Sequence, residues 1–231
     1  MTSESTVLGE AAEQRRTGLL ALAAETDLGA DEPATETIIM ALDLLAHFWS
    51  RPLADEVEQW ARARDLELEL RRRLPSGCQR EPSWLPVGLE ESLDLLDEYE
   101  RLFVGPGQVP CPPYESFWRE DVAVDIRRTL MGPCTADLKA LYNELGLELS
   151  SEGSELPDHV AVECEALAYA LSLDGAEQIA RRLFEHVGHW LPRFCRAVAK
   201  DSENPFYREL APLTLDWLAA VKSYFTAADA S

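Results

Sequence analysis

The sequence predicts an all-α protein, a single globular domain of about nine to eleven helices. Apolar residues recur at spacings of three and four along most of the chain, which is the helical period. No run combines a period of two with the enrichment in β-branched residues that strands show. The 231 residues, 46% of them hydrophobic, suffice for one compact domain or two small subdomains that share a core.

Helical patterns account for most of residues 1–131, which we expect to form an N-terminal helical half. The clearest pattern places five apolar residues on one face: Leu89, Leu93, Leu96, Tyr99 and Phe103. Pro52 ends an earlier helix, because proline and the residue before it disfavour helical continuation. We expect helices at 5–24, 35–49, 53–74, 89–103 and 117–131.

A proline-rich aromatic loop, residues 104–116, interrupts this half. Four prolines and two glycines between Val104 and Tyr114 cannot continue a helix. A loop that proline keeps stiff binds a peptide at low entropic cost, and Phe117 and Trp118 follow it directly. The alternative is that the loop only packs its aromatic side chains into the core, and composition alone favours that alternative.

Residues 133–231 are expected to form a C-terminal helical half, with a hinge near 132–133, where Gly132 and Pro133 lie. Its first helix, 135–145, has Thr135 as a suitable N-cap and Gly146 just beyond its end. Pro157 suits the start of the next helix, because its missing N–H costs no hydrogen bond there. Further helices are expected at 176–187, 189–200 and 206–227.

The start of the helix at Pro157 carries Asp158 and His159, which are expected in its first turn. Asp158 complements the positive end of the helix dipole, and the same dipole favours a neutral His159. His159 and Glu163 are four residues apart and share a face. Three interpretations remain: Asp158 caps the helix, His159 with Glu163 forms half of a metal site, or the pair binds a cation such as an arginine side chain.

The formal net charge is −21, from 21 Lys and Arg against 42 Asp and Glu. A nucleic-acid-binding protein needs a basic surface, and so does stable attachment to anionic lipid, so neither partner is expected. A cationic peptide or protein surface would be attracted. Adaptation to salt explains the same excess of acid equally well.

Other signatures argue against catalysis and export. The five cysteines include no CxxC pair, which favours a reducing cytoplasm and neither a disulfide framework nor a structural zinc site. We identify no targeting segment and no apolar run long enough to span a membrane. Phosphate-loop, GxSxG and HExxH motifs do not occur, and Cys111 lies between prolines with no histidine nearby. We therefore expect no enzyme, no metal and no cofactor.

Two segments, YERLFVGPGQVPCPPYESFW and LPDHVAVECEALAY, together resemble the paired motifs of the TorD/DmsD family of redox-enzyme maturation chaperones. The resemblance covers residues 89–171 closely. It implies an all-helical cytoplasmic chaperone that binds the twin-arginine leader, and the apo catalytic subunit, of a molybdopterin oxidoreductase of the dimethyl-sulfoxide-reductase type. It also implies leader-binding roles for Tyr99, Leu102, Phe103, Pro113, Tyr114, Asp158 and His159.

The residue chemistry is consistent with that role and extends the candidate peptide site to Glu115, Ser116, Trp118 and Glu163. Aromatic and aliphatic side chains suit the apolar stretch of a leader, and carboxylates, with Glu120 and Asp121 nearby, suit its arginines. Two alternatives are a nucleotide-binding (GTP) enzyme and a direct carrier of the molybdopterin cofactor. The protein is expected to be a monomer or a domain-swapped homodimer.

Overall fold

The computed structural model describes residues 6–7, 34–52, 67, 70, 89–120, 131–148 and 155–229. These residues are mostly helical, which confirms the all-α prediction, while a count of nine to eleven helices is not confirmed. Two short strands, β1 (Thr6–Val7) and β2 (Leu147–Glu148), pair in parallel. The helices of the described part are α2 (Ala34–Trp49), α4 (Leu89–Tyr99), the π-helix η1 (Glu100–Val104), α5 (Glu115–Trp118), α6 (Pro133–Glu144), α7 (Val160–Ser172), α8 (Glu177–Asp201) and α9 (Pro205–Asp229).

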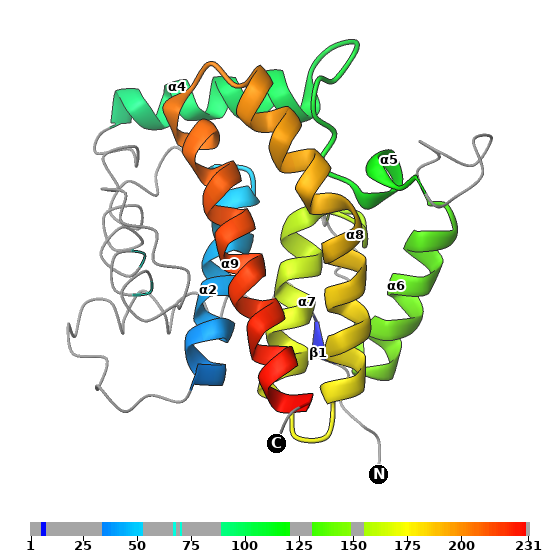
Figure 1. Ribbon diagram of the computed structural model, residues 1–231. Helices are drawn as coiled ribbons and strands as arrows, with labels where there is room; N and C mark the ends of the chain where they lie inside the picture. The colour runs from blue at the N-terminus through cyan, green and yellow to red at the C-terminus, as the bar shows by residue number, and fades with distance from the viewer. Residues whose placement is uncertain are drawn as a thin grey trace.

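Four long helices, α2, α7, α8 and α9, lie side by side and form the body of the molecule (Figure 1). Helix α4 crosses one end of them, and α5 and α6 lie beside α8. The buried apolar side chains form one continuous cluster that draws on both predicted halves, from Ile38 to Phe225. Trp49 of α2 packs within it and donates its indole N–H to Thr214 Oγ1 of α9 at 3.0 Å. The core therefore ties the N-terminal part of the chain to its last helix.

Several predicted elements are confirmed, and the corrections have local causes. Helix α6 begins at Pro133 with Gly132 as its N-cap, so the expected cap at Thr135 is wrong. Proline is favoured at a first helical position, and Thr135 is buried in the first turn instead. Gly146 has a φ of 72° just beyond the C-cap, as predicted. Helix α8 runs uninterrupted through Gly188, so the two helices expected at 176–187 and 189–200 are one.

Other expected elements fall partly or wholly outside the described residues. The start of the helix expected at 5–24 is wrong, because residues 6–7 form β1. Glu67 and Leu70 are helical, as expected, while the rest of 53–74 lies outside the described residues. The helix expected at 117–131 begins earlier, as α5, which ends at Trp118 with an extended Arg119, and residues 121–130 lie outside the described residues. The hinge near 132–133 and the division into two halves remain predictions.

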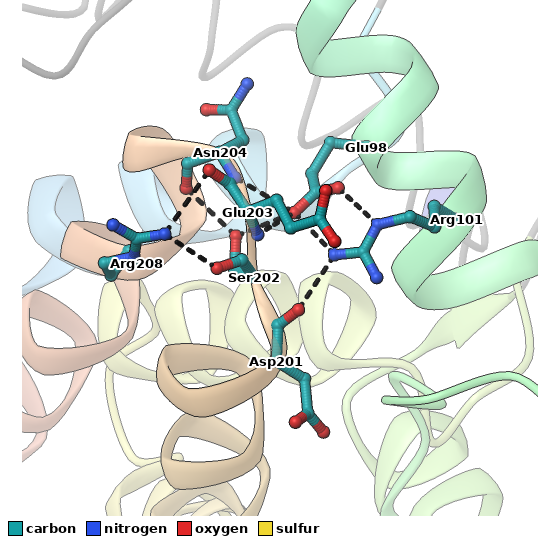
Figure 2. A network of polar contacts seen from close by, with 7 residues as sticks. All are labelled: Glu98, Arg101, Asp201, Ser202, Glu203, Asn204 and Arg208. Atoms are coloured by element: carbon teal, nitrogen blue, oxygen red, sulfur yellow. Dashed lines mark hydrogen bonds and ion pairs between the residues drawn. The ribbon is translucent and has the colours of Figure 1, made fainter.

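A polar network fastens α4 to the turn between α8 and α9 (Figure 2). One carboxylate oxygen of Glu98 accepts hydrogen bonds from Ser202 Oγ at 2.9 Å and from the backbone N–H groups of Glu203 and Asn204 at 2.7 and 3.1 Å. Arg101 donates to the other oxygen of Glu98 at 2.7 Å and to the carbonyl of Asp201 at 2.8 Å. Backbone N–H and C=O groups that have no partner within a helix at its ends thereby gain side-chain partners in this turn.

Candidate functional site

In the first motif, Gly105 ends the helical segment, and the proline-rich loop that follows packs back against that segment. Helix α4 continues into η1, and Gly105 ends it with a φ of 51°, a conformation that other residues rarely adopt. The proline-rich loop then turns back, and the backbone N–H of Cys111 donates to the carbonyl of Leu102 at 3.0 Å. The loop is therefore ordered against η1, as its proline content predicts.

Not every predicted residue of this motif faces the outside. Tyr99 and Leu102 are core residues, and Tyr99 contacts the ring of Phe103 with centroids 5.0 Å apart. Phe103 also contacts Tyr207 of α9, edge to face, at 5.1 Å. The alternative that the motif packs aromatic side chains into the core therefore holds for Tyr99, Leu102 and most of Phe103.

A pocket of about 1010 Å³ opens between the proline-rich loop, α5 and α8. Phe103, Tyr114 and Trp118, all predicted site residues, contribute to its wall. Trp118 is held in place by its indole N–H, which donates to the carbonyl of Pro112 at 2.7 Å. The full lining is Phe103, Val104, Gly107, Gln108, Val109, Pro110, Pro112, Tyr114, Phe117, Trp118, Arg119, Glu120 and Arg193. The wall is thus mainly apolar, with three charged side chains.

The second motif binds directly to the first through their backbones. Residues Tyr114 and His159 form an isolated antiparallel bridge, with their rings edge to face at 5.3 Å. The N–H of Val160 donates to the carbonyl of Pro113 at 3.0 Å, and the N–H of Glu115 donates to the carbonyl of Asp158 at 2.8 Å. The two motifs, about forty residues apart in the sequence, therefore form one structural unit, and the first motif of this unit supplies most of the pocket wall.

The expected positions of Asp158 and His159 in a first helical turn are wrong. Helix α7 begins at Val160, and His159 is its N-cap, with Nδ1 accepting from the N–H of Ala161 at 3.2 Å. Asp158 does not cap this helix; its Oδ2 accepts from the N–H of Ser116 at 3.2 Å, in the first turn of α5. A carboxylate there satisfies an N–H that α5 itself leaves without a partner.

His159 and Glu163 are both completely enclosed, which changes how they can act. Burial lowers the pKa of His159 to about 4, so the ring is neutral at pH 7, as predicted, with burial and not the helix dipole as the largest cause. Burial, together with the nearby carboxylates of Glu115 and Asp158, raises the pKa of Glu163 well above its usual range. Glu163 accepts from the indole N–H of Trp190 at 3.2 Å.

Three buried carboxyl groups, those of Glu115, Asp158 and Glu163, thus lie under the site, each at most 1% exposed. Arg119 donates to Glu115 at 2.6 Å, and Nδ1 of His186 lies 2.9 Å from the same carboxylate. One oxygen each of Asp158 and Glu163 has no hydrogen-bond partner in the described part of the chain, but none of the three acids lines the pocket, so a ligand's arginine cannot reach them without opening the structure. Within the described ranges, no group of three or more acidic, cysteine or histidine side chains is placed to hold a metal ion.

Sequence reasoning missed the basic side chains of the pocket, Arg119 and Arg193, and the contact between Nδ1 of His186 and the carboxylate of Glu115. Arg193 carries no local signal, because it comes from α8, far along the chain, whereas Arg119 directly follows the first motif and was visible there. Cys111, Cys134, Cys164 and Cys195 are buried and free, whereas Cys78 and Asp121 lie outside the described residues. In the part of the chain that the structure describes, no helix is long and apolar enough to cross a bilayer.

Comparisons with known proteins bear on the region that contains both motifs. A family model described as "Nitrate reductase delta subunit" matches residues 85–196. The chain is 31% identical over 134 residues to the Tat proofreading chaperone DmsD of Salmonella typhi, covering 56% of this chain and 62% of that one. It is 30% identical over 135 residues to the chaperone protein TorD of Shewanella loihica, covering 58% and 64%. The match therefore spans less than two thirds of either relative.

A third relative is the chaperone protein YcdY of Escherichia coli K12, 25% identical over 152 residues that cover 64% of this chain and 76% of that one. All three relatives are named as chaperones, and two of them bear the names DmsD and TorD of the family that the motifs resemble.

Proposed function

The family match and these relatives support the TorD/DmsD family for this chain, and from that premise we propose that it is a system-specific chaperone. Its ligand in this proposal is the twin-arginine leader of a molybdopterin oxidoreductase of the dimethyl-sulfoxide-reductase type, together with the apo form of that enzyme. It would assist cofactor insertion and assembly in the cytoplasm before export. Binding of this kind needs neither a reaction of its own nor a cofactor.

The pocket against the proline-rich loop is the observation that carries the proposal. Its volume of about 1010 Å³ lies at the upper end of ligand pockets, which suits several side chains of a peptide. Val104 is 48% exposed at its wall, an apolar surface that a leader's apolar stretch would cover. The loop is stiffened by prolines, so little conformational entropy is lost when a peptide binds.

The eleven predicted site residues divide into two roles in this proposal. Phe103, Tyr114 and Trp118 contact the peptide in the pocket. The remaining eight support that wall from the core or from the buried bridge beneath it: Tyr99, Leu102, Pro113, Glu115, Ser116, Asp158, His159 and Glu163. Replacing a residue of the second group would weaken binding by moving the wall, and it would also destabilise the fold.

The test is titration of candidate twin-arginine leader peptides against the protein, with a Lys-Lys version of each peptide as the comparison. Val104→Asp places a charge in the pocket wall and should weaken binding at least tenfold, because a buried carboxylate against the peptide's apolar stretch is costly. Leu173→Asp is the matched control, since Leu173 is 37% exposed at the end of α7 and does not line the pocket. Equal effects of the two substitutions, or no preference for arginine, would contradict the proposal.

The two alternatives from the sequence, a nucleotide-binding enzyme and a molybdopterin carrier, gain no support from the relatives' names. Binding of GTP in the same titration would support a nucleotide-binding enzyme. Pterin fluorescence in the purified protein would support a molybdopterin carrier. Light scattering would separate a monomer from a domain-swapped dimer.

A further inference from the structure

One edge of the pocket is formed by an ion pair between two of its own lining residues. Nη2 of Arg193, on α8, donates to Oε2 of Glu120, and Nη1 of the same guanidinium donates to the carbonyl of Trp118 at 3.2 Å. The side chains of Arg193 and Glu120 are 37% and 60% exposed. A guanidinium group therefore already lies on a carboxylate at the mouth of an apolar pocket.

Glu120 differs from the other acidic residues of the two motifs. The carboxyl groups of Glu115, Asp158 and Glu163 are buried. Among the described residues that line the pocket, Glu120 alone has a carboxylate. A cation that arrives with a peptide in this pocket can reach Glu120 without any rearrangement of the core.

We propose that Glu120 receives a guanidinium group of the bound leader and that Arg193 is its competitor within the protein, displaced when the leader binds. This inference rests on the proposed function. The carboxylate would keep a guanidinium partner in both states, first Arg193 through Nη2 and then the leader's arginine. Exposed ion pairs are weak, so exchanging one partner for the other costs little.

The pocket explains why exchange favours the leader. The apolar stretch of the leader would cover the exposed part of the wall beside Glu120, which supplies a hydrophobic contribution that Arg193 alone lacks. Arg193 retains the carbonyl of Trp118 as a partner after it is displaced. The pair thus keeps the mouth of the pocket neutral until a peptide carrying both an arginine and an apolar stretch is present.

Substitutions of Glu120 and of Arg193 should change the affinity for the leader in opposite directions. Fluorescence titration would use one labelled leader peptide with Arg-Arg and the same peptide with Gln-Gln. Glu120→Gln should weaken binding of the Arg-Arg peptide about fivefold to tenfold and leave the Gln-Gln peptide unchanged. Arg193→Gln should tighten binding of the Arg-Arg peptide about twofold to fivefold, because it removes the competitor. In the double variant that gain should disappear.

Matched controls come from an exposed pair elsewhere on the same helix. Arg182 of α8 lies 3.3 Å from Glu144 of α6, with side chains 53% and 50% exposed, and neither lines the pocket. Arg182→Gln and Glu144→Gln should leave both peptides' affinities unchanged, and circular dichroism would verify folding of all variants.

Weaker binding by Arg193→Gln would overturn the inference, because Arg193 would then contact the peptide itself. An unchanged affinity in Glu120→Gln would overturn it too, while leaving the proposed chaperone function in place. Failure of the unmodified protein to bind any leader peptide would overturn both.

Discussion

The Glu98 network gives the sharpest stability prediction. Glu98→Gln keeps the shape of the side chain but removes its charge, so the hydrogen bonds from Ser202, Glu203 and Asn204 become neutral ones. Hydrogen bonds to a charged group contribute about 1.5–3 kcal/mol, and neutral ones about 0.5–1.5 kcal/mol. Losing about 1 kcal/mol at each of the three donors predicts a fall of about 3 kcal/mol in the free energy of unfolding at pH 7.

The effect should depend on pH in one direction. Burial acts to raise the pKa of Glu98, but the hydrogen bonds from Arg101, Asn204, Ser202 and Glu203 outweigh it and hold that pKa below the ordinary 4.5. A depressed carboxyl pKa stabilises the folded state above the unfolded-state value, and the contribution is lost as the pH falls through the folded-state value. The gap between the two proteins should therefore be constant above about pH 5 and should narrow below pH 4.5.

Urea unfolding followed by tryptophan fluorescence, from pH 3 to pH 8, measures this gap. Glu100→Gln is the control, because Glu100 lies two residues away and its pair with Arg51 is exposed, at 38% and 51%. That substitution should cost less than about 1 kcal/mol. The reasoning would be refuted if both variants lost the same free energy of unfolding, or if the difference between Glu98→Gln and the parent protein stayed constant down to pH 3.

Three further outcomes follow from buried groups and from backbone geometry. Burial lowers the pKa of His159 to about 4, so the unfolded ring binds a proton below about pH 6.5 that the folded ring excludes. The free energy of unfolding of the parent protein, relative to that of His159→Asn, should therefore fall by about 3 kcal/mol from pH 7.5 to pH 4. Chemical denaturation measures this change. Burial and two neighbouring carboxylates raise the pKa of Glu163, so Glu163→Gln should be at least as stable as the parent at pH 8. The difference in the free energy of unfolding between the two proteins should vanish below pH 4.5, where both side chains are neutral. A Glu163→Gln protein that is less stable than the parent by more than about 1 kcal/mol at pH 8 would contradict this. Gly146→Ala should lower stability by about 1–2 kcal/mol, since the φ of Gly146 is 72°, whereas Gly188→Ala inside α8 should raise it by up to about 1 kcal/mol, and thermal melts compare the two.

The helices that sequence predicted well are those whose buried face is continuous. Helix α2 begins and ends within a residue of its expected bounds, because one apolar face and a terminal Pro52 define it. Gly188 was expected to end a helix, yet Val187, Trp190 and Leu191 continue the buried stripe of α8 across it. A single helical glycine costs about 1 kcal/mol, which this packing outweighs.

The sequence predicted which residues make up the candidate site but not which of them are buried. The two motifs do lie together, with Tyr114 and His159 bridged, although the period of three and four gives no sign that Glu100–Val104 forms a π-helix. Spacing places His159 and Glu163 on one side of the chain, but only the packing of residues 113–116 and of α8, with Trp190, decides that this side is covered. The partner of Glu120 could not be predicted either, because Arg193 reaches it from 73 residues away in the sequence.

The bridge between the two motifs has a consequence for how the protein is made. Ser116 and Asp158 are 42 residues apart, and closing a loop of that length costs about 3 kcal/mol of chain entropy. The docking of α7 against α2 and α8 offsets that cost, so we expect the bridge between the two motifs to form cooperatively with these contacts. A chain still on the ribosome that ends before residue 158 therefore lacks the backbone contacts that hold Tyr114 and Glu115 in place. In the finished protein, the amide hydrogens of Glu115 and Val160 should exchange with solvent only through global unfolding.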